Sequence, residues 1–122
     1  MLKHIGLSIF NYSEIKNFYQ DLLGFKIEFD MQISAELSKK VFGIEKETSV
    51  YMLSKNDLTL ELFLTKHTNV NTYQHLCISV EYRETLIQKA RKKGYNCIVI
   101  KRDKSDLVFI RDKSNNIFEI KE

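Results

Sequence analysis

The sequence predicts a single α+β domain built from two copies of one module, each with the order strand, helix, strand, strand, strand. Three observations lead to this prediction: a length that allows one domain, hydrophobic spacings that switch between the strand and helix periods, and a long internal repeat. The chain has 122 residues, of which 43% are hydrophobic and 29% charged. This composition is typical of a globular protein and excludes intrinsic disorder, collagen and a coiled coil.

In the first half, alternating apolar residues predict a strand over 3–10. A helix follows, because apolar residues recur at helical spacing between Ser13, a candidate N-cap, and Gly24, a candidate residue just past the helix end. Residues 34–47 are charged and weakly patterned, and predict no element of their own. Three further strands are predicted, the last two around a hairpin turn at Lys55-Asn56-Asp57: 25–33, 49–55 and 58–65.

The second half repeats this order. A strand at 74–81 precedes a helix that closes at Gly94, and three strands complete it: 96–102, 107–112 and 116–122. A shift of 71 residues lays HIGLSI over HLCISV, and a shift of 58 lays KNDLTLEL over KSNNIFEI. The two shifts differ by the extra length of the first half around 34–47. We therefore expect one domain over 1–122, with a first module at about 1–66 and a second at about 73–122.

Four polar residues occupy repeat-equivalent positions in otherwise apolar strands: His4, Glu61, His75 and Glu119. The strand period places each on the face opposite the main apolar row of its module. A single such His or Glu would be read as hydrogen-bonded or solvent-facing, but an ionised carboxylate within a strand is costly unless it is paired or coordinated. Two carboxylates beside two imidazoles predict a site for a divalent cation, with nickel, zinc, cobalt, manganese and iron(II) as candidates.

The remaining reactive side chains predict less. His67 has no repeat partner and is expected at the surface, whereas Cys77 shares the face of His75 and is expected as a small buried hydrophobe. Both cysteines are expected as reduced thiols, and the absence of a signal-peptide pattern predicts a cytoplasmic protein. The net charge of +3 is too mild for a nucleic-acid partner, and no apolar run is long enough for a membrane span.

Five segments of the chain carry a family resemblance: HIGLSI, EIKNFYQDLLGFK, LTLELF, QHLCISVE and DKSNNIFEI. They resemble the vicinal oxygen chelate superfamily, which includes glyoxalases, epimerases, bleomycin and fosfomycin resistance proteins and dioxygenases. Residues 112–116 (DKSNN) stand where the family usually has an Asp-Pro-Asp-Gly-Asn turn. The resemblance implies two βαβββ modules, each a curled mixed sheet that forms half of a metal-binding cup with a helix on the outside. For a short chain it also implies a homodimer, often with sites shared between subunits.

The His-Glu-His-Glu set is similar to that of glyoxalase I. This similarity implies that His4, Glu61, His75 and Glu119 together bind one divalent ion per site, nickel or zinc foremost. The implied activity is that of a lactoylglutathione lyase-like enzyme, which transfers a proton next to a carbonyl through a metal-held enediolate. Glu119, or as the alternative Glu61, would be the catalytic base. The implied small-molecule substrate is an anionic thiol adduct or a CoA thioester.

Other members of the family offer alternatives. A methylmalonyl-CoA epimerase-like isomerase would use the same ligands, whereas a bleomycin resistance-like protein would bind a small molecule without chemistry. Ser8 and Thr65 replace an Arg and an Asn that commonly contact glutathione in glyoxalases, so the resemblance does not extend to recognition of that thiol. Arg102 or Arg111 would be available for an anionic substrate, and residues 34–47 stand where the family often has a substrate-covering loop.

Overall fold

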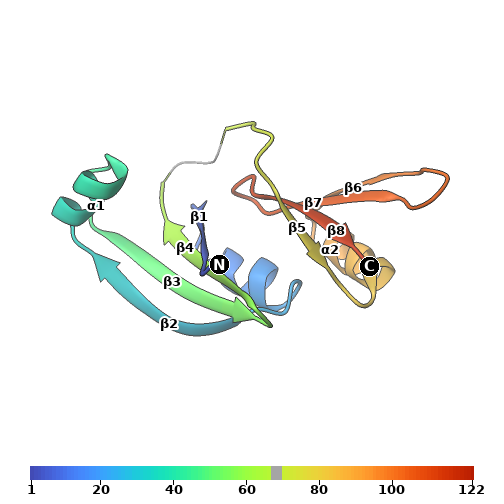
Figure 1. Ribbon diagram of the computed structural model, residues 1–122, viewed down its shortest axis with the longest axis horizontal. Coiled ribbons are helices and arrows are strands. Elements are labelled where there is room, and N and C mark those ends of the chain that lie inside the picture. Colours follow the sequence, from blue (N-terminus) through green and yellow to red (C-terminus); the bar gives the residue numbers. More distant parts are fainter. Residues whose placement is uncertain (67–69) are drawn as a thin grey trace.

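Two four-stranded mixed sheets dominate the computed structural model, which describes residues 1–66 and 70–122 (Figure 1). The strand orders are β1-β4-β3-β2 and β5-β8-β7-β6. In each sheet the first strand pairs in parallel with the last, and the other pairs are antiparallel. The two open sheets confirm the predicted α+β architecture of two repeated modules. His67 lies outside the described residues.

The first module contains four strands and two helices: β1 (Ile5–Ile9), η1 (Ile15–Gln20), β2 (Lys26–Ile33), α1 (Ala35–Phe42), β3 (Thr48–Lys55) and β4 (Leu58–Leu64). The second module contains four strands and one helix: β5 (Leu76–Ser79), α2 (Arg83–Lys92), β6 (Asn96–Ile100), β7 (Leu107–Arg111) and β8 (Ile117–Lys121). The predicted strands are therefore present, most of them shorter by one or more residues at an end.

The first helix differs from its prediction. It is a π-helix that begins at Ile15, and Ser13 does not cap it, because the Ser13 hydroxyl donates instead to Oδ1 of Asn11 at 2.7 Å. Asn11 thus organises the turn that leads into the helix. The helix ends at Gln20, several residues before the predicted end, and the chain then turns at Gly24, whose φ of +79° is a left-handed conformation that glycine takes without steric cost.

The segment 34–47 contains a helix that the sequence analysis did not predict. Ser34 caps α1, because its hydroxyl accepts a hydrogen bond from the Leu37 amide at 3.1 Å. Gly43 ends it with φ = +73°. The helix packs on the first sheet, where Ser38 and Val50 are buried. A substrate-covering loop was expected here, and the structure has a capped helix instead.

A continuous hydrophobic core lies on one side of the two sheets and joins both modules. It combines η1, α2 and the inward residues of β4, β7 and β8. The Phe18 ring of η1 packs against Tyr95 and Phe118 of the second module, with ring centroids 4.9 and 5.5 Å away. We call the opposite side of each sheet its open face.

Buried hydrogen bonds reinforce this junction between the modules. The Asp112 carboxylate accepts from the Tyr19 hydroxyl at 2.6 Å and from the side-chain amide of Asn116 at 2.8 Å. The backbone amides of Ser114 and Asn116 donate to its other oxygen. Burial raises the pKa of Asp112, and burial together with the nearby Asp112 carboxylate raises that of Tyr19.

A second carboxylate, Glu14, is almost fully buried at the same junction. It accepts from the Tyr95 hydroxyl at 2.6 Å and from the Lys113 amide, also at 2.6 Å. Burial and this hydrogen bond to Glu14 raise the pKa of Tyr95. A buried carboxylate is tolerated only when such donors replace water, so these contacts fix the two modules relative to each other.

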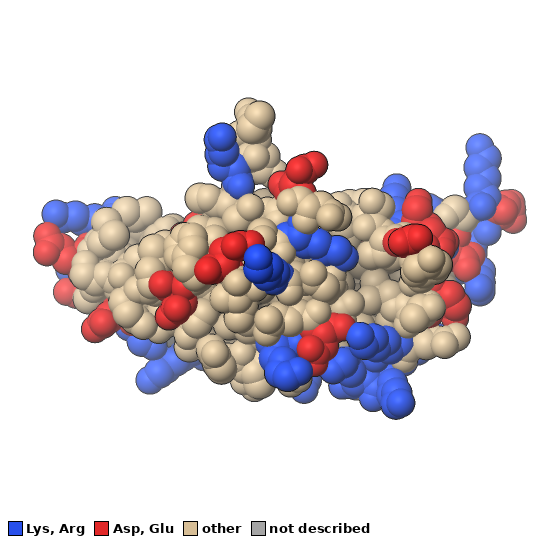
Figure 2. All heavy atoms as spheres, turned by 90° about the horizontal axis from the view of Figure 1, so that it is seen from below, with Lys and Arg blue, Asp and Glu red and all other residues tan. Residues whose placement is uncertain are grey.

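The surface carries both signs of charge. On the face shown in Figure 2, Lys and Arg are interleaved with Asp and Glu rather than gathered into one patch. Among the described residues, no helix is both long and apolar enough to cross a membrane.

Candidate metal centre

The two histidines stand immediately before the first strand of each module. His4 precedes β1 and His75 precedes β5, so the prediction that each lies within its strand is wrong by one residue. Their side chains are 48% and 41% exposed. Both imidazoles are therefore within reach of solvent, at the ends of short edge strands.

The two glutamates lie within inner strands and face away from the core. In β4, Leu60 and Leu62 are completely buried, whereas the Glu61 side chain between them is 14% exposed on the open face. The Glu119 side chain in β8 is 15% exposed in the same way. The prediction that these carboxylates lie opposite the apolar row is confirmed by this alternation.

The repeat extends to the strand register. Gly6 pairs with Glu61 across the parallel β1–β4 ladder, and Cys77 pairs with Glu119 across β5–β8. Gly6 and Cys77 are themselves equivalent under the 71-residue shift. Each module therefore presents its histidine and its glutamate on adjacent strands in the same relative position.

Within each module the imidazole meets the carboxylate. Nε2 of His4 lies 2.7 Å from Oε2 of Glu61, and Nε2 of His75 lies 3.6 Å from Oε2 of Glu119. The other ring nitrogen of His75 lies 2.8 Å from the carbonyl oxygen of Tyr73, which orients the ring. We call these the first and second His–Glu pairs. Each provides one nitrogen and one oxygen donor, the ligand types of zinc, nickel, manganese and iron(II) sites.

The four side chains form two pairs rather than one cluster. Within residues 1–66 and 70–122, no group of three or more His, Cys, Asp and Glu side chains is placed to hold a metal ion. A structural or catalytic metal site in proteins takes at least three such ligands. One pair is therefore half of a coordination sphere, and its donor set fits a divalent metal only when two further donors are added.

Two neighbours of Glu119 distinguish the second pair. The ammonium group of Lys121 lies 3.7 Å from Oε1 of Glu119. Cys77 is exposed on the open face, so the prediction that it is buried is wrong: β5 is an edge strand of its sheet. Desolvation, followed by the Glu119 carboxylate, raises the pKa of the Cys77 thiol, which disfavours the nucleophilic thiolate.

The two arginines considered for an anionic substrate lie in the second module. Arg111 donates to Oδ1 of Asn115 at 2.5 Å and is engaged in the turn. Arg102 lines a cavity of about 200 Å³ together with Glu119 and Lys121. Nε of Arg102 donates to the Ser105 carbonyl at 3.0 Å, so both arginines are hydrogen-bonded within turns, and of the two only Arg102 lines a cavity with a predicted metal ligand.

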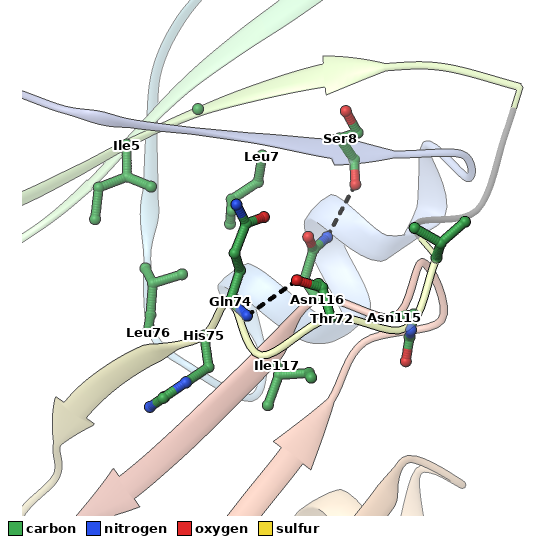
Figure 3. Close-up of a pocket in the computed structure, with 12 residues that line it drawn as sticks. Ile5, Leu7, Ser8, Thr72, Gln74, His75, Leu76, Asn115, Asn116 and Ile117 are labelled. Atoms are coloured by element: carbon green, nitrogen blue, oxygen red, sulfur yellow. Dashed lines mark hydrogen bonds between the residues drawn. The ribbon is translucent and has the colours of Figure 1, made fainter.

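A cavity of about 590 Å³ separates β1 from the segment that leads into β5 (Figure 3). His75 is the one member of the two pairs among its lining residues, and Figure 3 shows its ring pointing away from Ser8 and Asn116. The side-chain amide of Asn116 bridges the modules here, donating to the Ser8 carbonyl at 2.9 Å. This cavity therefore borders the second pair without containing it.

A smaller cavity of about 240 Å³ lies between α1 and the open face of the first sheet. Gly6, Phe42 and Phe63 line it, together with Ser8 and Thr65. Ser8 and Thr65 were predicted from the family resemblance, whereas the two aromatic residues were not. A sequence signal for α1 was present. Ser34 is a typical capping residue and Gly43 a typical helix-ending glycine, and the residues between them have apolar side chains at helical spacing.

Comparison with known proteins agrees with the geometry. The family model described as "Glyoxalase/Bleomycin resistance protein/Dioxygenase superfamily" matches residues 1–120, which confirms the resemblance found in the sequence. Comparison with curated proteins gave no match.

Solved structures share the fold. A glyoxalase family protein from Enterococcus faecalis is 20% identical, with a TM-score of 0.74 over 100% of this chain and 97% of that chain. The fosfomycin resistance protein FosX from Listeria monocytogenes is 14% identical, with a TM-score of 0.77 over 99% of this chain and 91% of that chain. One structure of a FosX variant contains Mn(II) and dihydroxypropylphosphonic acid.

Proposed function

The chain belongs to the Glyoxalase/Bleomycin resistance protein/Dioxygenase superfamily, and from this premise we propose that it is a glyoxalase-like, metal-dependent lyase or isomerase. Its reaction would be proton transfer at a carbon next to a carbonyl group. One observation carries the proposal: both modules present a His–Glu pair on the open face, in the same strand register. A duplicated scaffold without a site would have no reason to keep two costly carboxylates within its strands.

His4, Glu61, His75 and Glu119 would hold one divalent cation, nickel or zinc foremost. Two imidazole nitrogens and two carboxylate oxygens give a four-ligand set that leaves room for substrate oxygens. When bound, such a cation stabilises negative charge that develops on a substrate oxygen. Both imidazoles can bind this cation without repacking of the core, since both side chains are over 40% exposed.

The two pairs would come from different chains. Among the described residues of one chain, the two pairs do not come together into a group of three or more ligands. Each pair alone supplies only two donors. A two-fold homodimer that brings the first pair of one protomer to the second pair of its partner would create two identical sites. The separation of the pairs and the exposure of both histidines support this arrangement, because a second chain can reach them.

Glu119 is the proposed base. Its carboxylate lies 3.6 Å from Nε2 of His75, whereas Glu61 is held at 2.7 Å from His4, so Glu119 is the less tightly engaged of the two. The ammonium group of Lys121 lies 3.7 Å from the same carboxylate. Glu119 would leave the cation, accept the substrate proton and return it to the neighbouring carbon or oxygen.

The substrate would be an anionic thiol adduct or a CoA thioester. The support for an anionic group is that cations are available beside Glu119: its cavity is lined by Arg83, Arg102 and Lys121, together with the carboxylates of Asp106 and Glu122. Ser8 and Thr65 contribute only hydroxyl groups on the other side, which favours a thiol other than glutathione.

Metal content tests the proposed function. The full-length protein, purified without a histidine tag and reloaded with nickel, zinc, cobalt or manganese, should bind about one ion per chain by plasma mass spectrometry. The His4→Ala/His75→Ala variant should lose this ion, whereas His67→Ala, a matched loss of one imidazole outside the pairs, should keep it. Absence of metal under every loading condition would overturn the metal-dependent activity.

A further inference from the structure

The cavity between α1 and the first sheet is lined mainly by apolar groups. Phe42 of α1 and Phe63 of β4 form its aromatic wall, with ring centroids 5.2 Å apart and planes inclined at 68°. Ile44 and Leu64 extend this wall. Phe42 and Ile44 remain 52% and 57% exposed, so the described chain leaves their apolar surfaces uncovered.

A glycine keeps this cavity open. A Cβ at Gly6 would lie 3.3 Å from the Phe63 ring, closer than ordinary van der Waals contact. The repeat-equivalent residue in the second module is Cys77, and no helix among residues 1–66 and 70–122 covers the open face beside it. Within the described residues, the cavity is therefore a feature of the first module, formed by α1 and by the missing side chain of Gly6.

The cavity begins beside the first His–Glu pair. Gly6 is the register partner of Glu61, and Phe63 follows Glu61 by two residues on the same face of β4. A molecule whose oxygen atoms lie at Glu61 has this cavity as a neighbouring apolar space, because Gly6 and Phe63 line it on the same face. This adjacency is the argument for an occupant that belongs to the molecule bound at the His–Glu pair.

We propose that this cavity binds an apolar side group of the substrate, either a flat ring or a short branched alkyl group, next to its metal-binding oxygens. The proposal rests on the proposed function of the His–Glu pairs. With about 240 Å³, the cavity is smaller than the roughly 300–1,000 Å³ of pockets that hold whole ligands. It therefore accepts one group of a larger molecule, and two aromatic edges favour a ring as that group.

The first test uses the metal-free protein. Benzyl alcohol is titrated into the ¹⁵N-labelled full chain, and saturable amide shifts are expected at Gly6, Phe42 and Phe63. Gly6→Ala fills the cavity and Phe42→Ala removes half of its wall, so both should weaken binding at least fivefold. Val41→Ala is the matched control, since Val41 is an exposed neighbour on α1 that does not line the cavity.

The second test compares two probes on the nickel-loaded protein by calorimetry. Phenylacetohydroxamate should bind about 10- to 100-fold more tightly than acetohydroxamate, because its ring leaves water. In Phe42→Ala this ratio should fall below about threefold. Equal affinities for the two probes, or benzyl alcohol shifts away from the cavity, would overturn the proposal.

The outcomes separate this proposal from the one on which it rests. If neither hydroxamate binds, the metal site is wrong, and the benzyl alcohol titration alone decides the cavity. If Phe42→Ala changes the oligomeric state by light scattering, the apolar face is a contact between chains and the substrate assignment is wrong. If Gly6→Ala does not fold, Phe42→Ala and Val41→Ala provide the comparison.

Discussion

The two modules share their strand order and their His–Glu pair, yet they differ in what surrounds that pair. In the first module β2 and β3 each have eight residues, and α1 covers part of the open face. In the second module β6, β7 and β8 have five residues each, and the open face beside Cys77 has no helix. The first pair therefore lies next to an apolar cavity, and the second next to cations.

Under the proposed function, this difference would separate the chemical step from substrate recognition. The repeated register keeps one histidine and one glutamate together in each module, as a symmetric metal site requires. The residues around each pair can differ between the modules, because they are not among the proposed metal ligands. A substrate held between a first and a second module would meet Phe42 and Phe63 on one side and Arg102 and Lys121 on the other.

The largest expected effect distinguishes the two glutamates. Glu119→Gln should lower turnover of a hemithioacetal or CoA thioester substrate by about 100- to 10,000-fold at full metal loading, because the amide cannot accept a proton. Glu61→Gln, measured at the same metal content, should lower it much less. An equal loss in both variants would show that the modules share the role of base.

The next effect concerns the junction that both modules share. Asp112→Ala should lower the free energy of unfolding by about 3–5 kcal/mol in urea titrations, since it removes the acceptor of the buried Tyr19 hydroxyl and one of the two acceptors of the Asn116 side-chain amide. Asp103→Ala, an exposed aspartate of the second module, is the control and should change it by less than about 0.5 kcal/mol. A loss in Asp112→Ala no larger than that of the control would contradict the proposed junction.

The pH dependence of the same residue sharpens this result. Burial raises the pKa of Asp112 above its ordinary value of 3.8, so the folded chain holds this proton more tightly than the unfolded chain. The resulting stabilisation is present below pH 3.8 and is lost as the pH rises through the raised pKa. The free energy of unfolding of the wild type should therefore fall relative to that of Asp112→Asn as the pH rises through this range. Urea titrations at a series of pH values measure this difference. A constant difference between the two proteins would show that the pKa is unshifted.

The smallest effect compares the two hairpin turns. Asn56 and Asn115 both adopt left-handed conformations, with φ of 51° and 68°. Asn56→Gly should leave stability within about 1 kcal/mol, because relief of strain offsets the greater freedom of glycine in the unfolded chain. Asn115→Gly should cost about 0.5–1.5 kcal/mol more by thermal unfolding, since it removes the hydrogen bond from Arg111. Equal losses of stability in Asn56→Gly and Asn115→Gly would show that the hydrogen bond from Arg111 does not stabilise the fold.

Much of the fold was predictable because its signals are local or repeated. Alternating apolar residues located the strands, and the repeat picked out His4, Glu61, His75 and Glu119 without any knowledge of their distances. The capped helix α1 was missed because its charged residues mask a weak apolar stripe, although Ser34 and Gly43 mark both of its ends.

Other features depend on tertiary contacts that no local pattern encodes. Cys77 has an apolar neighbour on each side, and its exposure follows only from the edge position of β5. Glu14 lies in a helical pattern of the first module, but it is buried by partners 81 and 99 residues away. The pairwise grouping of the four predicted ligands likewise depends on how far apart the modules stand.

The metal content of mixed dimers tests most directly whether the first His–Glu pair of one chain and the second His–Glu pair of its partner form one site. One chain carries His4→Ala/Glu61→Gln and the other His75→Ala/Glu119→Gln, each with its own affinity tag, and tandem purification isolates the mixed dimer. Each variant alone lacks one half of every site and should bind no metal. The mixed dimer retains one intact combination, so it should regain about half of the wild-type metal content. A mixed dimer as empty as its parents would show that the pairs do not combine between chains.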